Sequence, residues 1–364
     1  MHQQQDAFRS SKSNYDRKRV VIVDDSRALR GWLRVVLEQD PRLEVVGEAE
    51  NAVEARKVIK QTNPDVLTLD IEMPGMSGLD FLERVMKLRP MPVVMISGAT
   101  KSNSEATITA LSLGAIDCIL KPSGTADTRV CRDITRRVYS AACSTVQVKV
   151  KRAITAPRTG GNTASSVMPV ILIGASTGGV GALEAVLADL DSDSPPVVIV
   201  QHMPSTFLIS FSKMLNSHLP HDVGIAKENE PLGYGQIRLA PAMGQHTCVK
   251  RRGGQWYCYF QDEPTDALHC PSVDTLFGSA SQSAKDVIAV ILTGLGQDGA
   301  EGMQSLHKAG AMTLGQDKAS SVVYGMPRAA FDIGAVQQQL PLAKIGAAAN
   351  RLVATHVMQN KGKR

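Results

Sequence analysis

The stretch RVVIVDDSRALRGWLRVVL (19–37) decides the fold of the first half of the chain. Its opening, RVVIVD (19–24), is a β-branched run that ends in an acid, which is typical of a buried strand in a parallel sheet. Residues 27–38 then place apolar side chains on one face at helical spacing: Leu29, Leu33, Val36 and Leu37. The stretch therefore predicts a strand followed directly by a helix, the unit from which α/β sheets are built.

The same alternation continues along the first half of the chain. Four more strands are predicted near 43–48, 65–70, 92–96 and 116–120, with helical stretches between them. Five strands that alternate with helices over residues 19–142 indicate a doubly wound α/β domain with the sheet order 2-1-3-4-5.

A second doubly wound α/β domain is expected over residues 169–360. Three buried strands are predicted here, each running into a loop or a glycine-rich turn: PVILIGAS (169–176), PPVVIVQHMP (195–204) and DVIAVILTGLGQDG (286–299). Short strand-like pieces between them suggest a β-rich excursion from the main sheet: 236–239 and 256–260, within 223–271.

Polar segments precede and separate the two domains. Residues 1–18 are predicted to be a disordered tail. Residues 143–168 are rich in Thr, Ser, Gly, Ala and basic residues, which is typical of an interdomain linker. The alternation at 146–150 also fits a short strand.

Composition narrows the function classes. The 364 residues carry a net charge of +5 and are 43% apolar and 21% charged, as in ordinary globular proteins. The basic residues are spread out, which argues against nucleic-acid binding. No signal peptide, no apolar run of about 20 residues and no C-x-x-C pair is present, so we expect a cytoplasmic protein with reduced thiols and no membrane insertion.

Polar residues follow the strands of the first domain at the edge where such folds bind ligands. Asp24 and Asp25 end the first strand, Asp70 ends the third, Ser97 follows the fourth and Lys121 follows the fifth. Three crowded carboxylates repel one another, and a hard divalent cation such as Mg²⁺ relieves that repulsion. Together with Lys121, the metal would neutralise a phosphoryl group on Asp70, and the Ser97 hydroxyl would bond one of its oxygens.

Each acid also has a simpler interpretation as a helix cap or a solvated strand end. Asp25, directly before Ser26 and Arg27, fits an N-cap. Five suitable residues at the ends of four strands favour the phosphoacceptor site over five independent caps.

A serine nucleophile is predicted in the second domain. Residues 174–178, GASTG, fit the G-x-S-x-G turn that exposes a hydroxyl between a strand and a helix, with Ser176 at its centre. The amides at the start of the following helix would stabilise an oxyanion. The same turn also fits a dinucleotide-phosphate site, and a serine there can simply cap the helix.

Two further strand ends supply partners for this serine. His202 follows the strand VVIVQ and is the natural general base, and Asp298 follows VIAVIL, where it would orient the imidazole or merely cap the next helix. The next strand ends at His202 rather than at the acid of a dinucleotide site, which favours the triad. Other histidines follow less clearly defined strands: His218, His221, His246, His269 and His307.

The first domain resembles the receiver of two-component response regulators in the motifs VDDS, LDIEMPGMSGLDFL, MISGAT and LKPSG. That resemblance implies a flavodoxin-like fold with Asp70 as phosphoacceptor, Mg²⁺ held by Asp24, Asp25 and Asp70, and Ser97 and Lys121 coupling phosphorylation to shape. The sequence departs from the family at Cys118, where an aromatic is frequent, and at Gly98, where Ala is usual.

The whole chain from residue 19 to about 340 resembles the chemotaxis protein-glutamate methylesterases, the CheB family. The matching motifs are IGASTGG, QHMP, PSVD, ILTGLGQDGAEGM and VVYGMPRAA. The resemblance implies a Rossmann-like esterase domain with Ser176 as nucleophile, His202 as base and Asp298 as its orienting acid. Cys270 and Leu295 depart from the residues common in the family, Arg and Met.

The resemblance also implies an activity and its control. The family hydrolyses glutamyl methyl esters on methyl-accepting chemotaxis receptors, releases methanol and deamidates certain receptor glutamines. Its unphosphorylated receiver covers the esterase cleft, and the chemotaxis histidine kinase donates the phosphoryl group that uncovers it. We therefore expect Mg²⁺ in the receiver, no cofactor in the esterase domain, and a monomeric protein without a nucleic-acid partner.

Overall fold

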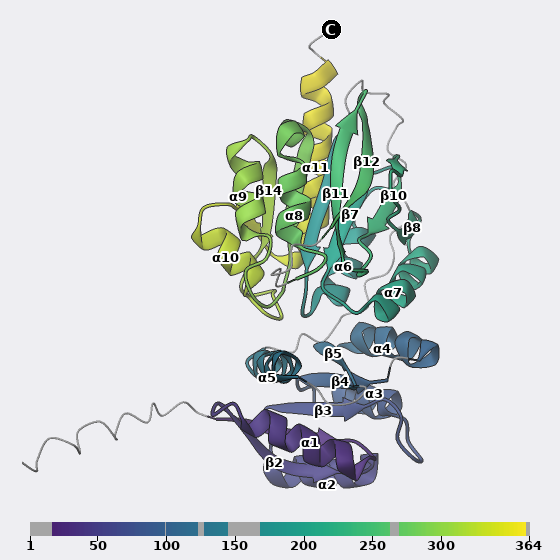
Figure 1. Cartoon of the computed structure of the whole chain (residues 1–364), viewed down its shortest axis with the longest axis vertical. Helices are drawn as coiled ribbons and strands as arrows, with labels where there is room; N and C mark the ends of the chain where they lie inside the picture. The colour runs from purple at the N-terminus through teal and green to yellow at the C-terminus, as the bar shows by residue number, and fades with distance from the viewer. Residues whose placement is uncertain (1–16, 99, 123–126, 145–167, 263–268, 362–364) are drawn as a thin grey trace, which may run out of the picture.

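The computed structural model describes residues 17–98, 100–122, 127–144, 168–262 and 269–361. Two α/β domains lie one above the other along the long axis of the molecule (Figure 1). The predicted tail 1–18 and linker 143–168 fall almost wholly outside the described residues, as does the possible strand at 146–150. Among the helices that are described, none has both the length and the apolar character to cross a bilayer.

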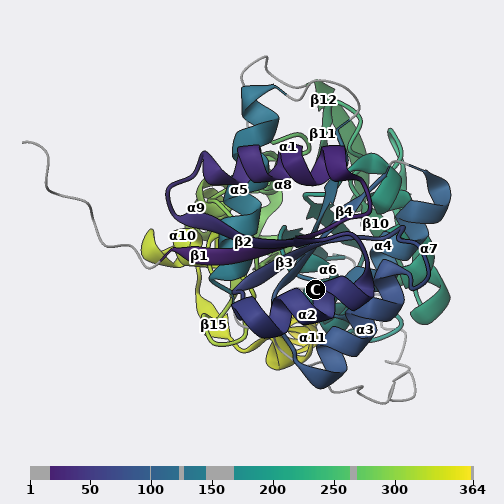
Figure 2. The ribbon, with the colours of Figure 1, turned by 90° about the horizontal axis from the view of Figure 1, so that it is seen from below.

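The first domain is built on a five-stranded parallel sheet in the order β2-β1-β3-β4-β5, as the sequence predicts. Its strands are β1 (Lys18–Val23), β2 (Leu43–Ala49), β3 (Val66–Asp70), β4 (Val93–Ser97) and β5 (Asp117–Leu120). Its helices are α1 (Arg27–Glu38), α2 (Ala52–Thr62), α3 (Gly78–Leu88), α4 (Lys101–Leu113) and α5 (Thr128–Ala142). Helices α1 and α5 cover one face of the sheet and α2, α3 and α4 the other (Figure 2).

Local sequence explains where α1 begins. The Ser26 hydroxyl accepts a hydrogen bond from the Leu29 amide at 3.3 Å, so Ser26, not Asp25, caps the helix. Leu33, Val36 and Leu37 are buried against the sheet, and Leu29 packs at the edge of the same cluster. The cap interpretation of Asp25 is therefore wrong, and its carboxylate is left exposed at the end of the sheet.

The second domain has a seven-stranded sheet in the order β15-β14-β13-β6-β7-β10-β8, with every pairing parallel. The strands are β6 (Val170–Ala175), β7 (Val197–Gln201), β8 (Asp222–Ile225), β10 (Gln236–Leu239), β13 (Val287–Ile291), β14 (Met312–Gln316) and β15 (Gln338–Leu340). A separate antiparallel sheet joins β11 (Gln245–Arg252), β12 (Gln255–Asp262) and β9 (Pro231–Leu232).

Helices cover both faces of the seven-stranded sheet. One face carries α6 (Gly179–Ala188), α7 (Ser205–His218) and α11 (Leu342–Lys361). The other carries α8 (Val273–Ser279), α9 (Ala300–Lys308), α10 (Met326–Asp332) and the small sheet, with the 3₁₀ turn η1 (Ser281–Asp286) leading into β13. This two-faced cover is the doubly wound arrangement that the buried strands predict.

One strand lies elsewhere than expected. Residues 256–260 belong to the β-rich excursion, but β10 (Gln236–Leu239) is part of the main sheet, between β7 and β8. Its pairing is parallel to β7, and Ile237 and Leu239 are fully buried. The placement of 236–239 in the excursion was wrong because parallel pairing joins segments that are distant in the sequence.

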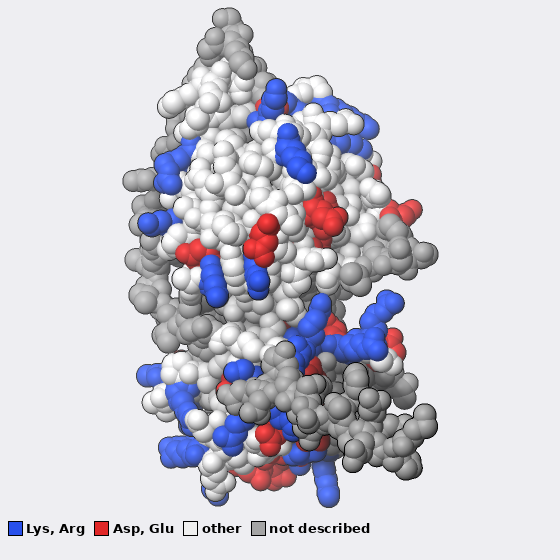
Figure 3. Space-filling model, turned by 90° about the vertical axis from the view of Figure 1, so that its left-hand side faces the viewer, with Lys and Arg blue, Asp and Glu red and all other residues white. Residues whose placement is uncertain are grey.

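The domains meet where α4, β5 and α5 of the first face α6 and α7 of the second (Figure 1). Leu111 on α4 shares one continuous apolar cluster with Val180 and Phe207, and the Ser112 hydroxyl donates to Glu184 Oε1 at 2.6 Å. In the space-filling view the molecule narrows at this junction, where charged side chains of both signs border it (Figure 3). Apolar burial therefore holds the two domains together.

Candidate active site

Ser176 lies at the carboxyl end of β6, in the turn that leads into α6. Its amide donates to Thr293 O at 3.0 Å, and its carbonyl accepts from the Gly179 amide at 2.7 Å. Gly178 adopts φ +77°, and a Cβ at Gly179 would lie 2.0 Å from Gln201 Oε1, so both positions require glycine. The cap of α6 is Gly178, without any side-chain bond, so Ser176 does not cap the helix.

His202 follows β7, the strand beside β6. Its amide donates to Ala175 O at 3.1 Å, which extends the pairing of the two strands and fixes His202 next to the serine turn. Its Nε2 lies 2.8 Å from Asp298 Oδ2. Because a carboxylate can only accept, Nε2 carries the proton and Nδ1 is the free acceptor.

Asp298 is held by a dense set of donors. The Ser272 hydroxyl and the Asp274 amide donate to Oδ1 at 2.8 and 2.9 Å, and the Val273 amide donates to Oδ2 at 2.8 Å. Burial alone would raise the pKa of Asp298, but the hydrogen bond from His202, the electrostatic interaction with that residue and the bonds from these amides lower the pKa below its ordinary value. Asp298 thus accepts bonds from the start of α8 instead of capping α9, whose cap is Gly299.

The pKa of a neighbouring carboxyl, that of Asp274, is shifted in the opposite direction. Burial and the charge of Asp298 raise the pKa of Asp274 to about 6. Asp274 accepts a hydrogen bond from the Gly302 amide at 2.7 Å and so ties α8 to α9 behind the site. Of the two adjoining acids, Asp298 is the one kept ionised beside His202.

Ser176 and His202 line the same cavity, of about 280 Å³, together with His269, Pro271 and Leu295. His202 Nδ1 is buried and has no hydrogen-bond partner among the described residues, so it is not bonded to Ser176 Oγ here. The structure therefore joins His202 to Asp298 directly and brings Ser176 only into the same cavity.

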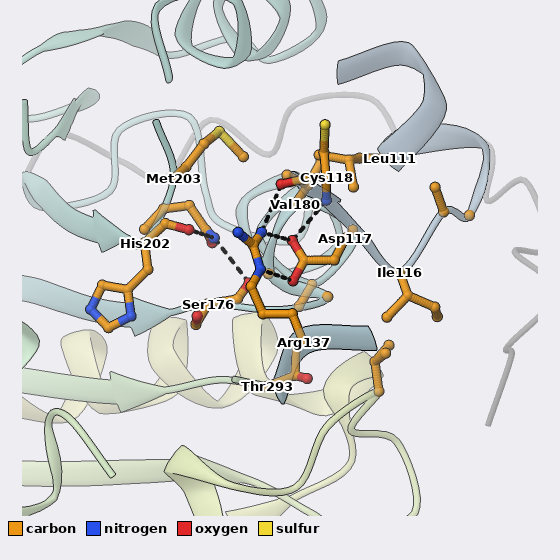
Figure 4. A pocket seen from close by; sticks show the side chains of 18 of the residues that line it. Leu111, Ile116, Asp117, Cys118, Arg137, Ser176, Val180, His202, Met203 and Thr293 are labelled. Atoms are coloured by element: carbon orange, nitrogen blue, oxygen red, sulfur yellow. Dashed lines mark hydrogen bonds and ion pairs between the residues drawn. The ribbon is translucent and has the colours of Figure 1, made fainter. Parts of the chain in front are cut away.

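Gln201 links the two strand ends and was missed in the sequence. Its Nε2 donates to Ser176 O at 2.9 Å and to His202 O at 3.2 Å, and its side chain is buried. Figure 4 shows these bonds beside Ser176 and His202. The only sequence signal was its position directly before His202.

The first domain reaches into this site through residues that the sequence did not single out. Ile116 O accepts from the Gly178 amide at 3.1 Å, and Asp117 Oδ2 accepts from the Thr177 hydroxyl at 2.9 Å. Arg137 of α5 pairs with Asp117 and donates to Cys118 O at 2.7 Å (Figure 4). The two residues after Ser176 are thus bonded to Asp117, the first residue of β5, and to Ile116 directly before it.

Asp117 and Arg137 also lie at the wall of the site. Both line the cavity that contains Ser176 and His202. They border a second, more apolar cavity of about 110 Å³ between the domains as well (Figure 4). The pKa of Arg137 stays above its ordinary value despite burial because Asp117 pairs with it. This buried ion pair is part of the junction between the domains.

A second cluster lies at the carboxyl edge of the first sheet. One oxygen each from Asp24, Asp25 and Asp70 lies within 4.8 Å of the others. Lys121 Nζ is 2.7 Å from Asp70 Oδ2 and 3.1 Å from Asp24 Oδ2. Burial, and to a lesser extent Asp24, raise the pKa of Asp70 to about 6 against the opposing effect of Lys121. The four predicted residues therefore meet in one place.

The fifth predicted residue of this cluster, Ser97, ends β4 and is fully buried. Its hydroxyl donates to Gly98 O at 3.2 Å, so it bonds its own neighbour rather than Asp70. Strand β4 pairs with β3, which ends in Asp70, so Ser97 lies on the neighbouring strand. To bond a phosphoryl group on Asp70, the Ser97 side chain would have to rotate.

The acidic cluster fits a hard divalent cation. Among the described residues, buried Asp24 Oδ2 has the Lys121 ammonium at 3.1 Å as an ion-pair partner and no other hydrogen-bond donor. Three carboxylates against one ammonium leave an excess of negative charge, and carboxylate oxygens are the ligands that Mg²⁺ prefers. Asp24, Asp25 and Asp70 are therefore able to hold the ion, which would supply positive charge beside a phosphoryl group.

Comparison with known proteins agrees with this two-domain arrangement. The family model "CheB methylesterase" matches residues 171–349, and "Response regulator receiver domain" matches residues 20–130. The solved catalytic domain of Thermotoga maritima CheB methylesterase is 31% identical, with a TM-score of 0.49, over 51% of this chain and 98% of that one.

Curated relatives extend over nearly the full length. A protein-glutamate methylesterase/protein-glutamine glutaminase of Agrobacterium fabrum is 47% identical over 340 residues, which is 90% of this chain and 94% of the relative. A protein of the same name from Caulobacter vibrioides is 45% identical over 330 residues, 90% of this chain and 96% of the relative. With its receiver followed by a CheB methylesterase domain, the chain belongs to the family of protein-glutamate methylesterases/protein-glutamine glutaminases.

Proposed function

We propose that the protein hydrolyses glutamyl methyl esters on methyl-accepting chemotaxis receptors, releases methanol, and deamidates receptor glutamines under the control of its receiver. The observation that carries this proposal is the 2.8 Å bond between His202 and Asp298, with Ser176 lining the same cavity. The names of the curated relatives supply the substrate class.

In the proposed mechanism, Ser176 Oγ attacks the ester carbonyl and His202 Nδ1 takes its proton. Asp298 stabilises the imidazolium through Nε2. The proton then passes from Nδ1 to the leaving methoxide, and methanol departs. Water, deprotonated by His202, attacks the acyl-serine and releases the glutamate. With a glutamine substrate, ammonia leaves in place of methanol.

The amides at the start of α6 would donate to the oxyanion that forms during this attack. One of them, Gly178 N–H, donates to Ile116 O of the receiver at 3.1 Å. We infer that the receiver must move away before substrate reaches Ser176, because its β5 residues occupy the turn. This is the closed form of the enzyme.

We propose that phosphorylation of Asp70 by the chemotaxis histidine kinase opens this form. Mg²⁺ would be held by Asp24, Asp25 and Asp70, with Lys121 and Ser97 contacting the phosphoryl group. The functional units are residues 19–142 and 169–360, joined by 143–168. We place the reaction in the cytoplasm and expect a monomer that binds no nucleic acid.

Methanol release from methylated receptor membranes tests the proposal, with and without a phosphoryl donor and Mg²⁺. We expect release that rises with the donor and falls at least about 10⁴-fold in Ser176→Ala. Ser217→Ala, which removes an exposed hydroxyl on α7, serves as the matched control. Release that survives in Ser176→Ala would overturn the nucleophile, and no release from any methylated receptor would overturn the function.

A further inference from the structure

His269 lies face to face with His202. The two ring centroids are 4.4 Å apart, and the ring planes differ by 14°. Both rings line the cavity that contains Ser176. The sequence offered His269 only as an alternative base. In the described structure His246 and His221 bond backbone groups instead, Ser272 N and Asp191 O.

One short segment, residues 269–274, both contacts His202 directly and holds its partner Asp298. His269 stacks on its ring, and three residues later Ser272 begins the series of donors that fixes Asp298. Val273 and Asp274 complete that series through their amides. The segment therefore sets the position of the acid and the face of the imidazole together.

The stacking supplies a restraint that Asp298 alone lacks. The torsion about the Cβ–Cγ bond of histidine is broad, so the ring turns easily. The bond from Nε2 to Asp298 fixes one atom of the ring and leaves its plane free to tilt. A second flat ring against its face limits that tilt. The orientation of the His202 ring plane in turn decides where Nδ1 points.

The surroundings of His269 keep it uncharged near neutral pH. Burial, followed by the proximity of His202, lowers the pKa of His269 below its ordinary value. Asp298 acts in the opposite direction, while Arg136 and Asp133 from α5 of the receiver act against each other. A neutral ring can lie against His202 when that ring takes a proton, whereas a charged ring would repel it.

We propose that His269 is a positioning residue for the esterase reaction. Its ring holds the imidazole of His202 in the orientation in which Nε2 bonds Asp298 and Nδ1 stays available to Ser176. The inference rests on the proposed function for its kinetic consequences, but the ring geometry is independent of any activity.

The kinetic test compares His269→Ala and His269→Phe with the full-length protein, phosphorylated in the presence of Mg²⁺. We expect His269→Ala to lower kcat about 10- to 100-fold, the effect of a misplaced catalytic group, with little change in KM. His269→Phe restores a flat ring and should recover most of kcat. His218→Ala, an exposed histidine on α7, should behave as wild type.

The pH dependence separates positioning from packing. Wild type should lose kcat as the pH falls partly because His269 becomes charged, so His269→Phe should retain a larger share of its neutral-pH kcat in the acidic limb of the profile. A purely structural ring would leave the shape of the profile unchanged. Equal kcat in His269→Ala and wild type would overturn the proposal.

A spectroscopic measurement needs no substrate. The stacked ring should shift the Cε1 proton of His202 by its ring current, and that shift should disappear in His269→Ala and persist in His269→Phe. If wild type releases no methanol, the proposed function fails while the NMR result still decides the geometry. An unchanged His202 resonance in His269→Ala would refute the stacking itself.

Discussion

At the scale of single residues, Asp298 shows how the site keeps a buried charge. Four donors reach its two oxygens, namely His202 Nε2, the Ser272 hydroxyl and the amides of Val273 and Asp274. Burial of a carboxylate is costly unless such donors surround it. In the proposed mechanism the charge is therefore in place before the imidazolium forms, and little rearrangement would be needed during the reaction.

Asp298→Asn should lower kcat by about 10³- to 10⁴-fold, because the amide removes the charge and disfavours the tautomer with Nε2–H. Methanol release under saturating phosphorylation is the measurement. Ser272→Ala removes one neutral donor and leaves the charge, so it should lose no more than about tenfold. An Asp298→Asn enzyme within tenfold of wild type would contradict the role of the acid.

Asp70 gives a pH-dependent prediction. Its pKa is raised to about 6, mainly by burial, so in the absence of metal it is neutral below that pH and a poor nucleophile. Phosphorylation by a small acyl phosphate should therefore decline as the pH falls through 6. Higher Mg²⁺ concentration should shift the decline to lower pH, since the cation favours the carboxylate.

The matching variants are Asp70→Asn, which should take up no phosphoryl group, and Asp65→Asn at the other end of β3. Asp65 accepts a bond from the Arg19 amide, far from the cluster, and its variant should be phosphorylated normally. A phosphorylation rate that stays flat between pH 5 and 8 at low Mg²⁺ would count against the raised pKa.

Residues at the ends of strands could be predicted from the sequence to lie together. Asp24, Asp70, His202 and Asp298 each follow an apolar run, and parallel strands bring such ends to one edge. His269 and Arg137 could not be found in this way. Their partners belong to other segments of the chain, and neither follows a strand.

At the scale of elements, the contact between β5 and the serine turn adds a polar link to the apolar junction of the two domains. Asp117 accepts from Thr177 across the junction and is itself paired with Arg137 of α5. Breaking a hydrogen bond to a charged, buried partner costs about 1.5–3 kcal/mol. One such bond is therefore enough to change the balance between closed and open forms measurably.

Asp117→Asn removes the charge that strengthens the bond from Thr177, so methanol release by the unphosphorylated enzyme should rise by roughly 10-fold, since each 1.4 kcal/mol taken from the closed form shifts the equilibrium tenfold. Release by the phosphorylated enzyme should change little. Glu83→Gln, an exposed change on α3, is the control and should leave both activities unchanged. Lower unphosphorylated activity in Asp117→Asn would show that this bond does not favour closure.

Element boundaries were predicted closely where the apolar run was strong. The helix expected at 27–38 is α1 (Arg27–Glu38), and the run at 286–299 contains β13 (Val287–Ile291). The misplaced strand, β10, has only Ile237 and Leu239 as apolar residues, so its sequence resembles that of an edge piece. Its place depends on the partner β7, which local pattern does not reveal.

At the scale of the whole molecule, the two domains share an apolar cluster. Leu111 of the receiver packs in the same cluster as Val180, Leu183 and Phe207 of the esterase domain. Each domain nevertheless has its own sheet and its own further core. The esterase domain should therefore fold without the receiver and expose an apolar face.

Deletion of residues 1–142 should raise methanol release above that of the unphosphorylated full chain and make it independent of the phosphoryl donor. The exposed face over α6 and α7 should also increase self-association, which sedimentation would detect. A truncated protein that is folded by circular dichroism but less active than the resting full chain would argue against inhibition by the receiver.

The bonds from Thr177 and Gly178 to β5 have a reciprocal consequence. In the proposed mechanism the receiver and the substrate compete for one turn, so whatever favours one disfavours the other, and thermodynamic linkage requires the coupling free energy to be equal in both directions. Occupancy of the esterase site should thus make Asp70 easier to phosphorylate. A receptor rich in methyl esters would then act as an allosteric effector of the receiver, so that the substrate itself prolongs the signal that removes it.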